Sequence, residues 1–266
     1  MPIPKSMNTD ALLHTTVLAA RAGGDALMRC FGKLQDIRKK GRVDLVTEAD
    51  EASEKAVMDI LEARYPEHGI LAEESGCRRE KAPFQWVLDP LDGTTNFAHG
   101  LPFFAVSLAL FHEKTPLTGC IYAPALGECF TAASGGGAYR NHCPMAVSLT
   151  QNLEDSLLAT GFPYAIHERF SPVTQRFARC LYAARGIRRL GAASLDLCYL
   201  ADGRFDAFWE EDLKPWDTAA GTLIAREAGA LVTDFQGHPH HMHAPDILAS
   251  NGRIHEPLRR LLELDP

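Results

Sequence analysis

Apolar residues recur along the chain in two kinds of pattern, one helical and one extended. Leu12, Val17 and Leu27 recur at helical spacing. The pattern predicts a helix over residues 9–31 that stops before Gly32. Short apolar runs rich in β-branched or aromatic residues predict buried strands instead. We expect strands within residues 68–74, 86–88, 104–111, 117–122, 157–160, 205–209 and 247–249.

Helix-start signals separate these predicted strands. Thr47 and Asp50 have the spacing of a capping box, and an apolar stripe continues from them toward residue 65. Ser171 followed by Pro172 is typical of an N-cap with proline at the first helical position, and it predicts a helix over 171–184. Further helices are expected within 191–203, 217–229 and 256–264.

Composition narrows the class of protein. With 46% hydrophobic and 23% charged residues the chain is typical of an ordered globular protein, and its net charge of −7 argues against a general nucleic-acid surface. The seven cysteines are odd in number and lack Cys-x-x-Cys spacing, so we expect reduced thiols. No secretory signal pattern and no membrane-length apolar run is present, so we expect a cytoplasmic protein with no membrane partner.

The most informative stretch is Trp86–Phe97, which places two carboxylates at the exit of a buried strand. Pro90 cannot continue a sheet ladder, so Asp89 is expected where the strand stops. Asp92 can turn back toward the same point, and Leu91 between them offers its backbone carbonyl. These hard oxygen donors suit Mg²⁺ or Mn²⁺. Gly93 and the two threonines after it provide backbone amides that could hold an anion.

Two other interpretations of this stretch remain open from the residues alone. Asp, Pro and Gly are also the residues that surface turns select. The aspartyl nucleophile of haloacid-dehalogenase-like phosphatases also precedes Gly-Thr, but those enzymes need their carboxylates two residues apart. Here Asp89 and Asp92 are three apart, which disfavours that mechanism.

Four further acidic residues and one histidine run each have a structural explanation beside a functional one. Asp50 could cap a helix, and Asp217 falls at a predicted N-cap. Glu73 and Glu74 end a short strand, so at most one of them is expected to reach a given metal. The run His238, His240, His241 and His243 has mixed spacing and no neighbouring cysteine, which favours loop histidines over a zinc site.

Four segments together resemble the inositol monophosphatase family of lithium-sensitive, Mg²⁺-dependent phosphatases. They are Asp44–Asp50, Glu73-Glu74-Ser75, Asp89–Phe97 and Trp216–Gly221, in the family's order and spacing. The resemblance implies a layered αβαβα sugar-phosphatase fold, usually dimeric, with metals held between two halves. We expect residues 1–147 to form an N-terminal α+β half with the metal-binding motifs. Residues 148–266 would form a C-terminal α/β half that completes the active site within one structural unit.

Carried over by position, the resemblance implies a role for each matching residue. The implied metal ligands are Glu73, Asp89, the Leu91 carbonyl, Asp92 and Asp217. The implied catalytic residues are Asp50, Glu73 and Thr94, where Asp50 and Thr94 polarise the attacking water. The implied substrate contacts are Asp92, Gly93, Thr94, Thr95, Gly191, Ala192, Ala193, Glu210 and Asp217, with Gly93 to Thr95 as the phosphate cradle.

The predicted activity is Mg²⁺-dependent hydrolysis of a phosphomonoester by a metal-activated water, with Mn²⁺ as an alternative ion. Thr95-Asn96-Phe97 favours inositol 1-phosphate, since relatives for other substrates often carry Lys or Arg at the Thr95 position. Related phosphatases for histidinol phosphate, fructose 1,6-bisphosphate or 3′-phosphoadenosine phosphates remain alternatives. So does a macromolecule-binding protein with a secondary phosphatase site. The expected partners are a small phosphorylated polyol or sugar and a second copy of the chain, with no nucleic acid.

Overall fold

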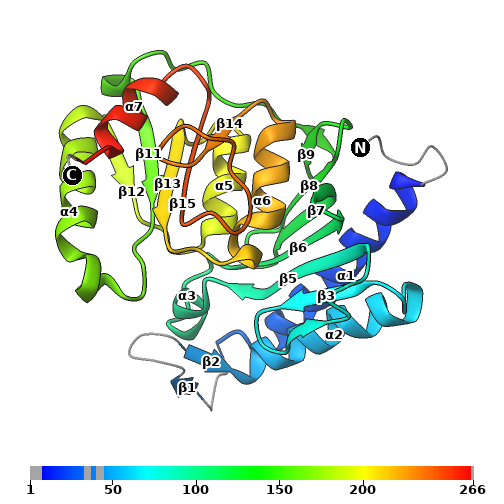
Figure 1. Cartoon of the computed structure of the whole chain (residues 1–266). Helices are drawn as coiled ribbons and strands as arrows, with labels where there is room; N and C mark the ends of the chain where they lie inside the picture. Colours follow the sequence, from blue (N-terminus) through cyan, green and yellow to red (C-terminus); the bar gives the residue numbers. More distant parts are fainter. Residues whose placement is uncertain (1–7, 33–36, 40–44, 265–266) are drawn as a thin grey trace.

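Two β-sheets and three helix layers stack in the order helices, sheet, helices, sheet, helices (Figure 1). The structure, a computed structural model, describes residues 8–32, 37–39 and 45–264, and the side chains among them except those of 37–39 and 45–47. Helices α1 (Thr9–Cys30) and α2 (Glu48–Arg64) pack on one face of an eight-stranded sheet. Helices α5 (Ala193–Ala201) and α6 (Pro215–Glu227) fill the space between the sheets, and α4 (Ile166–Ala183) and α7 (His255–Leu262) cover the far face of a five-stranded sheet. This αβαβα layering confirms the predicted fold class.

The first sheet is antiparallel apart from one parallel pair, β3 with β5, and its order is β10-β9-β8-β7-β6-β5-β3-β4. In chain order its strands are β3 (Gly69–Ala72), β4 (Gly76–Arg78), β5 (Phe84–Asp92), β6 (Ala105–His112), β7 (Thr115–Ala123), β8 (Glu128–Ala133), β9 (Ala138–Arg140) and β10 (Cys143–Pro144).

The second sheet has the order β12-β11-β13-β15-β14, and β11 is parallel to both of its neighbours. Its strands are β11 (Leu157–Thr160), β12 (Gly186–Arg188), β13 (Ala207–Glu211), β14 (Leu231–Thr233) and β15 (Asp246–Ser250). The remaining elements are a two-stranded sheet of β1 (Ile37–Lys39) and β2 (Leu45–Thr47), the short helix α3 (Thr94–Ala98) and the 3-10 turn η1 (Leu153–Asp155). The predicted division at residue 147 falls between the two sheets and stays a prediction.

Burial on both faces explains why the central elements read as continuous apolar runs. Helices cover β5 on both sides, and every residue from Trp86 to Asp92 is buried. A strand enclosed in this way carries no polar alternation. Helix α5 lies between two sheets for the same reason, and eight of its nine residues are buried.

The end of β5 differs from the prediction. We expected the strand to stop at Asp89, but it continues to Asp92 and pairs with β6 across an irregular register between these two residues. The irregularity places Pro90 where no ladder hydrogen bond is required, so the proline is tolerated inside the strand.

Two predicted helix starts are also wrong. Helix α4 begins at Ile166 rather than Ser171, and non-helical angles at Arg169 kink it, so that Pro172 lies in the first turn after the kink. Helix α6 begins at Pro215, whose fixed φ suits a first helical position. Lys214 is therefore the N-cap, and Asp217 lies in the third helical position.

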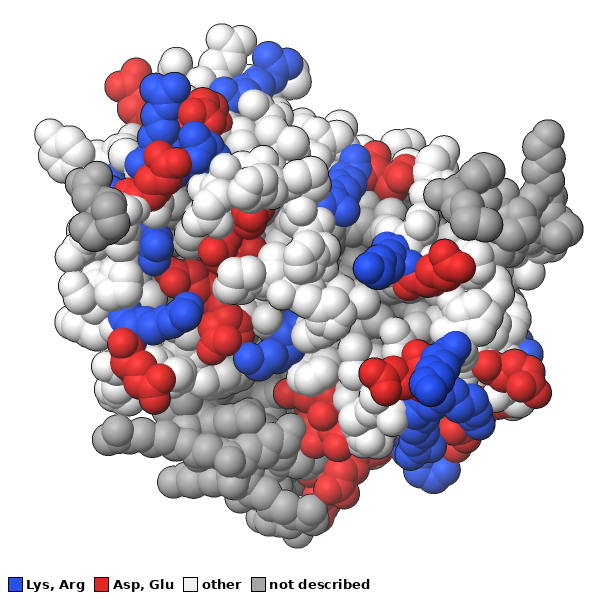
Figure 2. Space-filling view, in the orientation of Figure 1, with Lys and Arg blue, Asp and Glu red and all other residues white. Residues whose placement is uncertain are grey.

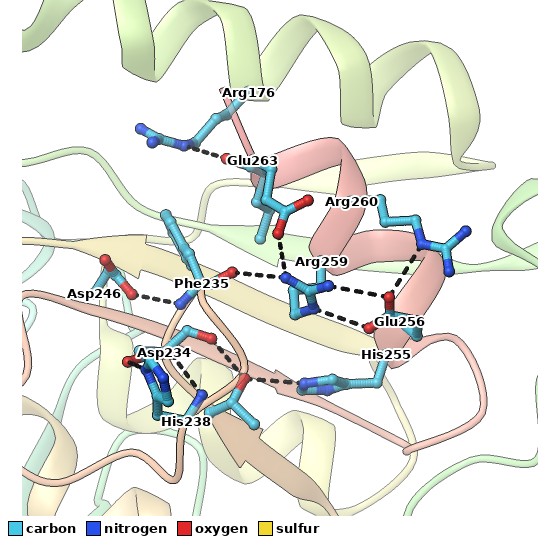
Figure 3. Close-up of polar contacts among 12 residues, drawn as sticks. Arg176, Asp234, Phe235, His238, Asp246, His255, Glu256, Arg259, Arg260 and Glu263 are labelled. Atoms are coloured by element: carbon cyan, nitrogen blue, oxygen red, sulfur yellow. Dashed lines mark hydrogen bonds and ion pairs between the residues drawn. The ribbon is translucent and has the colours of Figure 1, made fainter. Parts of the chain in front are cut away.

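Several other features agree with the sequence. The first helix ends at Cys30, one residue before the predicted end. All seven cysteines are free. Among the helices described, none is long and apolar enough to cross a bilayer. Helix α7 packs its apolar side on the second sheet and presents a network of Arg and Glu side chains outward (Figure 3).

Candidate active site

A cleft lies where the end of β5 faces β13 and the first turns of α5 and α6. Its volume is about 130 Å³. All predicted site residues except Asp50 line it: Glu73, Asp89, Leu91, Asp92, Gly93, Thr94, Thr95, Gly191, Ala192, Ala193, Glu210 and Asp217. Residues from five separate segments therefore meet at one place. Figure 2 shows acidic side chains gathered where β13 ends above α3.

Backbone and hydroxyl donors fix the two carboxylates of β5. Asp89 Oδ1 accepts the Leu91 N–H at 2.9 Å. Asp92 Oδ2 accepts both the backbone N–H of Ser194 at 2.8 Å and its hydroxyl at 2.5 Å. Ser194 lies in the first turn of α5, so the positive end of that helix faces Asp92. The carboxylates are thus held in place by groups that leave other oxygen lone pairs available.

The turn after Asp92 is equally constrained. Gly93 has φ +90°, and a Cβ atom there would lie 2.8 Å from the Phe103 carbonyl oxygen, so only glycine fits. The Thr94 hydroxyl donates to the Leu91 carbonyl oxygen at 3.0 Å. This bond couples the proposed phosphate cradle directly to a proposed metal ligand.

Electrostatic repulsion is concentrated in this cleft. Burial raises the pKa of Asp89 well above its usual range, and the neighbouring Glu73, Asp92 and Asp217 raise it further. Burial raises the pKa of Asp92 to about 6, against the opposing hydrogen bonds from Ser194. It raises the pKa of Asp217 to about 7, although the Lys214 N–H donates to Asp217 Oδ2 at 2.6 Å. A divalent cation would remove this repulsion.

The donor set fits a cation that needs few protein ligands. Within the described part of the chain, no three His, Cys, Asp or Glu side chains are already arranged as a complete metal site. Mg²⁺ usually keeps several waters and takes only one or two carboxylates together with substrate phosphate oxygens. Clustered oxygen ligands without sulfur or imidazole also suit Mg²⁺ or Mn²⁺ better than zinc.

The opposite wall of the cleft carries Glu210, which is 9% exposed. Its carboxylate lies so close to Gly161 that an added Cβ there would fall about 2.0 Å from its oxygen. Burial, followed by Asp217, raises the pKa of Glu210 to about 8. Gly161 therefore leaves the space in which Glu210 faces the cleft.

Three sequence-based candidates lie apart from the cleft lining. Asp50 is 1% exposed in the first turn of α2, and its proposed part in water activation stays a prediction. The backbone N–H of Glu74 donates to Glu54 Oε2 on α2 at 3.1 Å, whereas Glu73 lines the cleft. We expected these two residues to end a strand, but β3 stops at Ala72 and both lie in the turn that follows, so strand alternation does not account for the difference. The histidine run lies in the loop between β14 and β15, with only His240 buried.

Sequence reasoning missed several residues of this site. Ser194 was passed over, although a hydroxyl in the first turn of a helix could have been recognised as a carboxylate partner. Arg189 and Lys214 supply positive charge to the lining, and Tyr164 adds an aromatic ring. Their positions depend on how α4, β12 and β13 pack, and no local sequence pattern indicates that.

Comparison with known proteins gives matches along nearly the whole chain. The model of the inositol monophosphatase family matches residues 8–264. An inositol-1-monophosphatase of Synechocystis sp. is 41% identical over 267 aligned residues, covering 100% of this chain and 93% of that protein. A Nus factor SuhB of Vibrio cholerae is 42% identical over 246 residues, covering 91% of this chain and 92% of that protein.

Solved structures also match nearly the whole chain at about 40% identity. The extragenic suppressor protein suhB from Bartonella henselae superposes with a TM-score of 0.92 at 40% identity, covering 96% of this chain and 100% of that chain. An inositol monophosphatase from Anabaena superposes with a TM-score of 0.86 at 41% identity, covering 96% of each chain.

Proposed function

Because the chain belongs to the inositol monophosphatase family and is a phosphatase, we propose that it hydrolyses a phosphomonoester in the cleft at the end of β5, with Mg²⁺ as its metal. The observation that carries this proposal is the convergence of Glu73, Asp89, Asp92 and Asp217 beside the Gly93 turn. Carboxylates that repel one another in a buried cleft cost stability unless a cation or a proton compensates them. A metal-dependent reaction accounts for that arrangement.

Different residues of the chain have different roles in the proposed phosphate hydrolysis. Glu73, Asp89, the Leu91 carbonyl, Asp92 and Asp217 would share the binding of the metal ions, and a bound metal would lower the pKa of a water and neutralise phosphate and leaving-group oxygens. The amides of Gly93 to Thr95 hold the phosphate. Thr94 and Asp50 orient the attacking water, and no covalent enzyme intermediate is required. Ser194 keeps Asp92 in position through its two hydrogen bonds.

Inositol 1-phosphate is the proposed substrate. Glu210 and the small residues Gly191, Ala192 and Ala193 form the wall that faces the alcohol part. A buried carboxylate can accept hydrogen bonds from adjacent hydroxyl groups, which a polyol offers in quantity. The name of the Synechocystis relative, at 41% identity, supports the same choice.

The decisive experiment measures phosphate release from metal-depleted protein. Inositol 1-phosphate, histidinol phosphate, fructose 1,6-bisphosphate and 3′-phosphoadenosine 5′-phosphate are compared after adding back Mg²⁺, Mn²⁺ or Ca²⁺, with and without lithium. We expect turnover to return with Mg²⁺, to be inhibited by lithium and to be fastest with inositol 1-phosphate.

Two outcomes would contradict parts of the proposal. Full turnover in the presence of a chelator would remove the metal from the mechanism. A higher kcat/KM for one of the other three substrates would leave the phosphatase activity in place but contradict the choice of inositol 1-phosphate as its substrate. The variant Asp155→Asn serves as a control, because that carboxylate is exposed and pairs only with Arg185 at 2.9 Å among the described residues.

We also propose a homodimer. Helix α4 and the loop before it expose large apolar side chains, among them Tyr182 at 95% and Phe170 at 64%. Contiguous exposed apolar groups often mark a protein interface. Light scattering after size exclusion should give twice the chain mass of 29.2 kDa. A species with the mass of one chain, 29.2 kDa, at micromolar concentration would refute the dimer.

A second candidate function is binding to a macromolecular partner. The Vibrio cholerae relative that is 42% identical bears the name Nus factor SuhB, which supports a role besides hydrolysis. An Asp89→Asn protein that still captures a stoichiometric partner would establish this role separately from catalysis. Loss of capture in that variant would instead tie any binding to the catalytic cleft.

A further inference from the structure

A second cavity lies along α6, toward the end of the helix that is farther from the catalytic cleft. It is enclosed by the start of β5, the β6–β7 hairpin, the second half of α6 and loop residues 240–243. Its volume is about 500 Å³, against about 130 Å³ for the catalytic cleft. Small-molecule sites typically occupy about 300–1,000 Å³. The cavity therefore has the size of a ligand site, and nothing in the proposed hydrolysis uses it.

Two buried polar groups in the cavity wall lack partners. His240 is 5% exposed and Thr222 is 7% exposed, and both line the cavity. Neither His240 Nδ1 nor the Thr222 hydroxyl has a hydrogen-bond partner among the described residues. A buried polar group without a partner is unfavourable for folding, so it calls for an explanation. Both groups make this part of the cavity wall polar.

The loop that carries His240 is nevertheless held in one place. Arg226, on the last turn of α6, donates to the His240 carbonyl oxygen at 2.7 Å. Met242 packs into the same apolar cluster as α6 and Trp216. The cavity wall is thus formed by fixed elements, which is the usual condition of a pre-formed binding site.

The charges around the cavity favour an anion. Lys114 at the tip of the β6–β7 hairpin and Arg226 both line it, and Glu113 is the one acidic side chain in its described lining. The negative end of the α6 dipole opposes an anion, but it amounts to about half a charge. Glu113 offsets one of the two cations, and the full charge of the other still outweighs the dipole.

We propose that this cavity binds a small organic anion. Lys114 and Arg226 hold its phosphate, carboxylate or sulfonate group, and its apolar part packs against Phe111, Leu223 and Met242, which line the same space. Asp217 and Arg226 are nine residues apart on α6, about 13 Å at 1.5 Å per residue. Ligand in this cavity therefore does not compete directly with substrate in the cleft.

The test uses 8-anilinonaphthalene-1-sulfonate, a fluorescent aromatic sulfonate that carries no phosphate to hydrolyse. We expect saturable binding of one molecule per wild-type chain. Lys114→Gln and Arg226→Gln should each weaken binding at least about 5-fold, while Arg21→Gln should not, because Arg21 lines a different cavity beside α1. Lys114 makes no hydrogen bond or ion pair among the described residues, so its replacement leaves the fold unchanged.

Competition then identifies the chemistry of the ligand. Phenylphosphonate and benzoate should displace the probe, and benzyl alcohol, which lacks the charge, should not. Stronger displacement by phenylphosphonate would indicate a phosphate-type ligand, and stronger displacement by benzoate would indicate a carboxylate ligand. Equal displacement by benzyl alcohol, unchanged binding in both cavity variants, or loss of binding in Arg21→Gln would each overturn the proposal. Circular dichroism melts of every variant exclude probe binding to unfolded protein.

Discussion

Carboxylates gather in two regions of this molecule, the cleft between the sheets and the outer surface around α7, and their partners differ. At α7, Glu256 pairs with Arg259 and Arg260, and Glu263 pairs with Arg259 (Figure 3). Hydrogen bonds from these arginines lower the pKa of Glu256 to about 2. In the cleft, no ion pair within the described residues involves Asp89, Asp92 or Asp217, and burial raises the pKa of each.

The difference separates structural charges from functional ones. Around α7 the chain supplies its own cations, so each carboxylate is neutralised within the fold. In the cleft, our proposal is that a cation from outside the chain compensates the buried carboxylates. Strand β13 contains both kinds side by side: Glu210 and Glu211 both line the cleft, but only Glu211 pairs with Arg176, at 2.7 Å.

The largest expected effect follows from removing a carboxylate of the cleft. Asp89→Asn keeps the side-chain shape but removes one negative charge, so it should lower kcat/KM by about 100-fold or more. In chelator the same variant should melt about 2–4 °C higher than wild type, equivalent to ~1 kcal/mol, because repulsion with Glu73, Asp92 and Asp217 is relieved. Phosphate release measures kcat/KM, and calorimetry measures the melting temperature. A less stable and fully active variant would contradict the functional assignment.

Removing a group that only positions a carboxylate should have a smaller effect. Ser194→Ala deletes the hydroxyl that donates to Asp92 but keeps the backbone N–H. Loss of such a supporting contact typically reduces metal affinity or activity about 10–100-fold. We expect raised metal concentrations to restore part of the rate, as measured by Mg²⁺ titration of phosphate release. Ser171→Ala, on the exposed side of α4, should leave the titration unchanged.

The paired carboxylate of β13 should matter for stability instead. Arg176→Gln removes the nearer of the two arginines that pair with Glu211, since Arg169 lies farther away at 3.7 Å. It also removes the donor to the Leu262 carbonyl oxygen, and the Arg176 and Glu211 side chains are only 16% and 11% exposed. Hydrogen bonds to charged groups contribute about 1.5–3 kcal/mol, so we expect about 2 kcal/mol of destabilisation in urea unfolding. Arg260→Gln, in a pair that is 71% and 52% exposed, is the control and should shift the melting temperature by less than about 1 °C.

The last effect is absent at neutral pH, appears only on acidification, and concerns a buried histidine beside α7. Burial lowers the pKa of His255 from 6.5 to about 4, and its ring nitrogens bond Thr233 and Ser250 at 3.0 and 2.8 Å. The unfolded chain binds more protons than the folded one between these pH values. Stability from neutral His255 is therefore complete above about pH 6.5 and is lost as the pH falls toward 4, by on the order of 3 kcal/mol.

The measurement compares urea unfolding of wild type and His255→Gln across this pH range. The variant should lose less stability on acidification, since it has no imidazole to protonate. Parallel curves for the two proteins would show that His255 is not responsible. His240, whose pKa burial also lowers to about 4, is present in both proteins and cancels in the comparison.

Local pattern was sufficient for most elements of the fold and for most candidates in the site. The strand through Trp86–Leu88, the helix from Thr9 and the turn at Gly93 each follow from apolar period, capping and backbone freedom, which neighbouring residues determine. The start of α4 was missed because a kink at Arg169 allows a helix to continue past Pro172. No local rule indicates where a chain will bend to accommodate a proline.

By itself the sequence predicted most helices and strands and the pair Asp89 and Asp92, because these follow from residue type and spacing along the chain, whereas the order of the layers and the other carboxylates of the cleft came from the resemblance to a known family. Only the tertiary structure decided which carboxylates are compensated. Glu210 and Glu211 are neighbours with the same side chain, yet Gly161 gives one its space beside the cleft and Arg176 pairs with the other. Such partners come from distant segments, and electrostatic energy depends on distance in space rather than on separation in sequence.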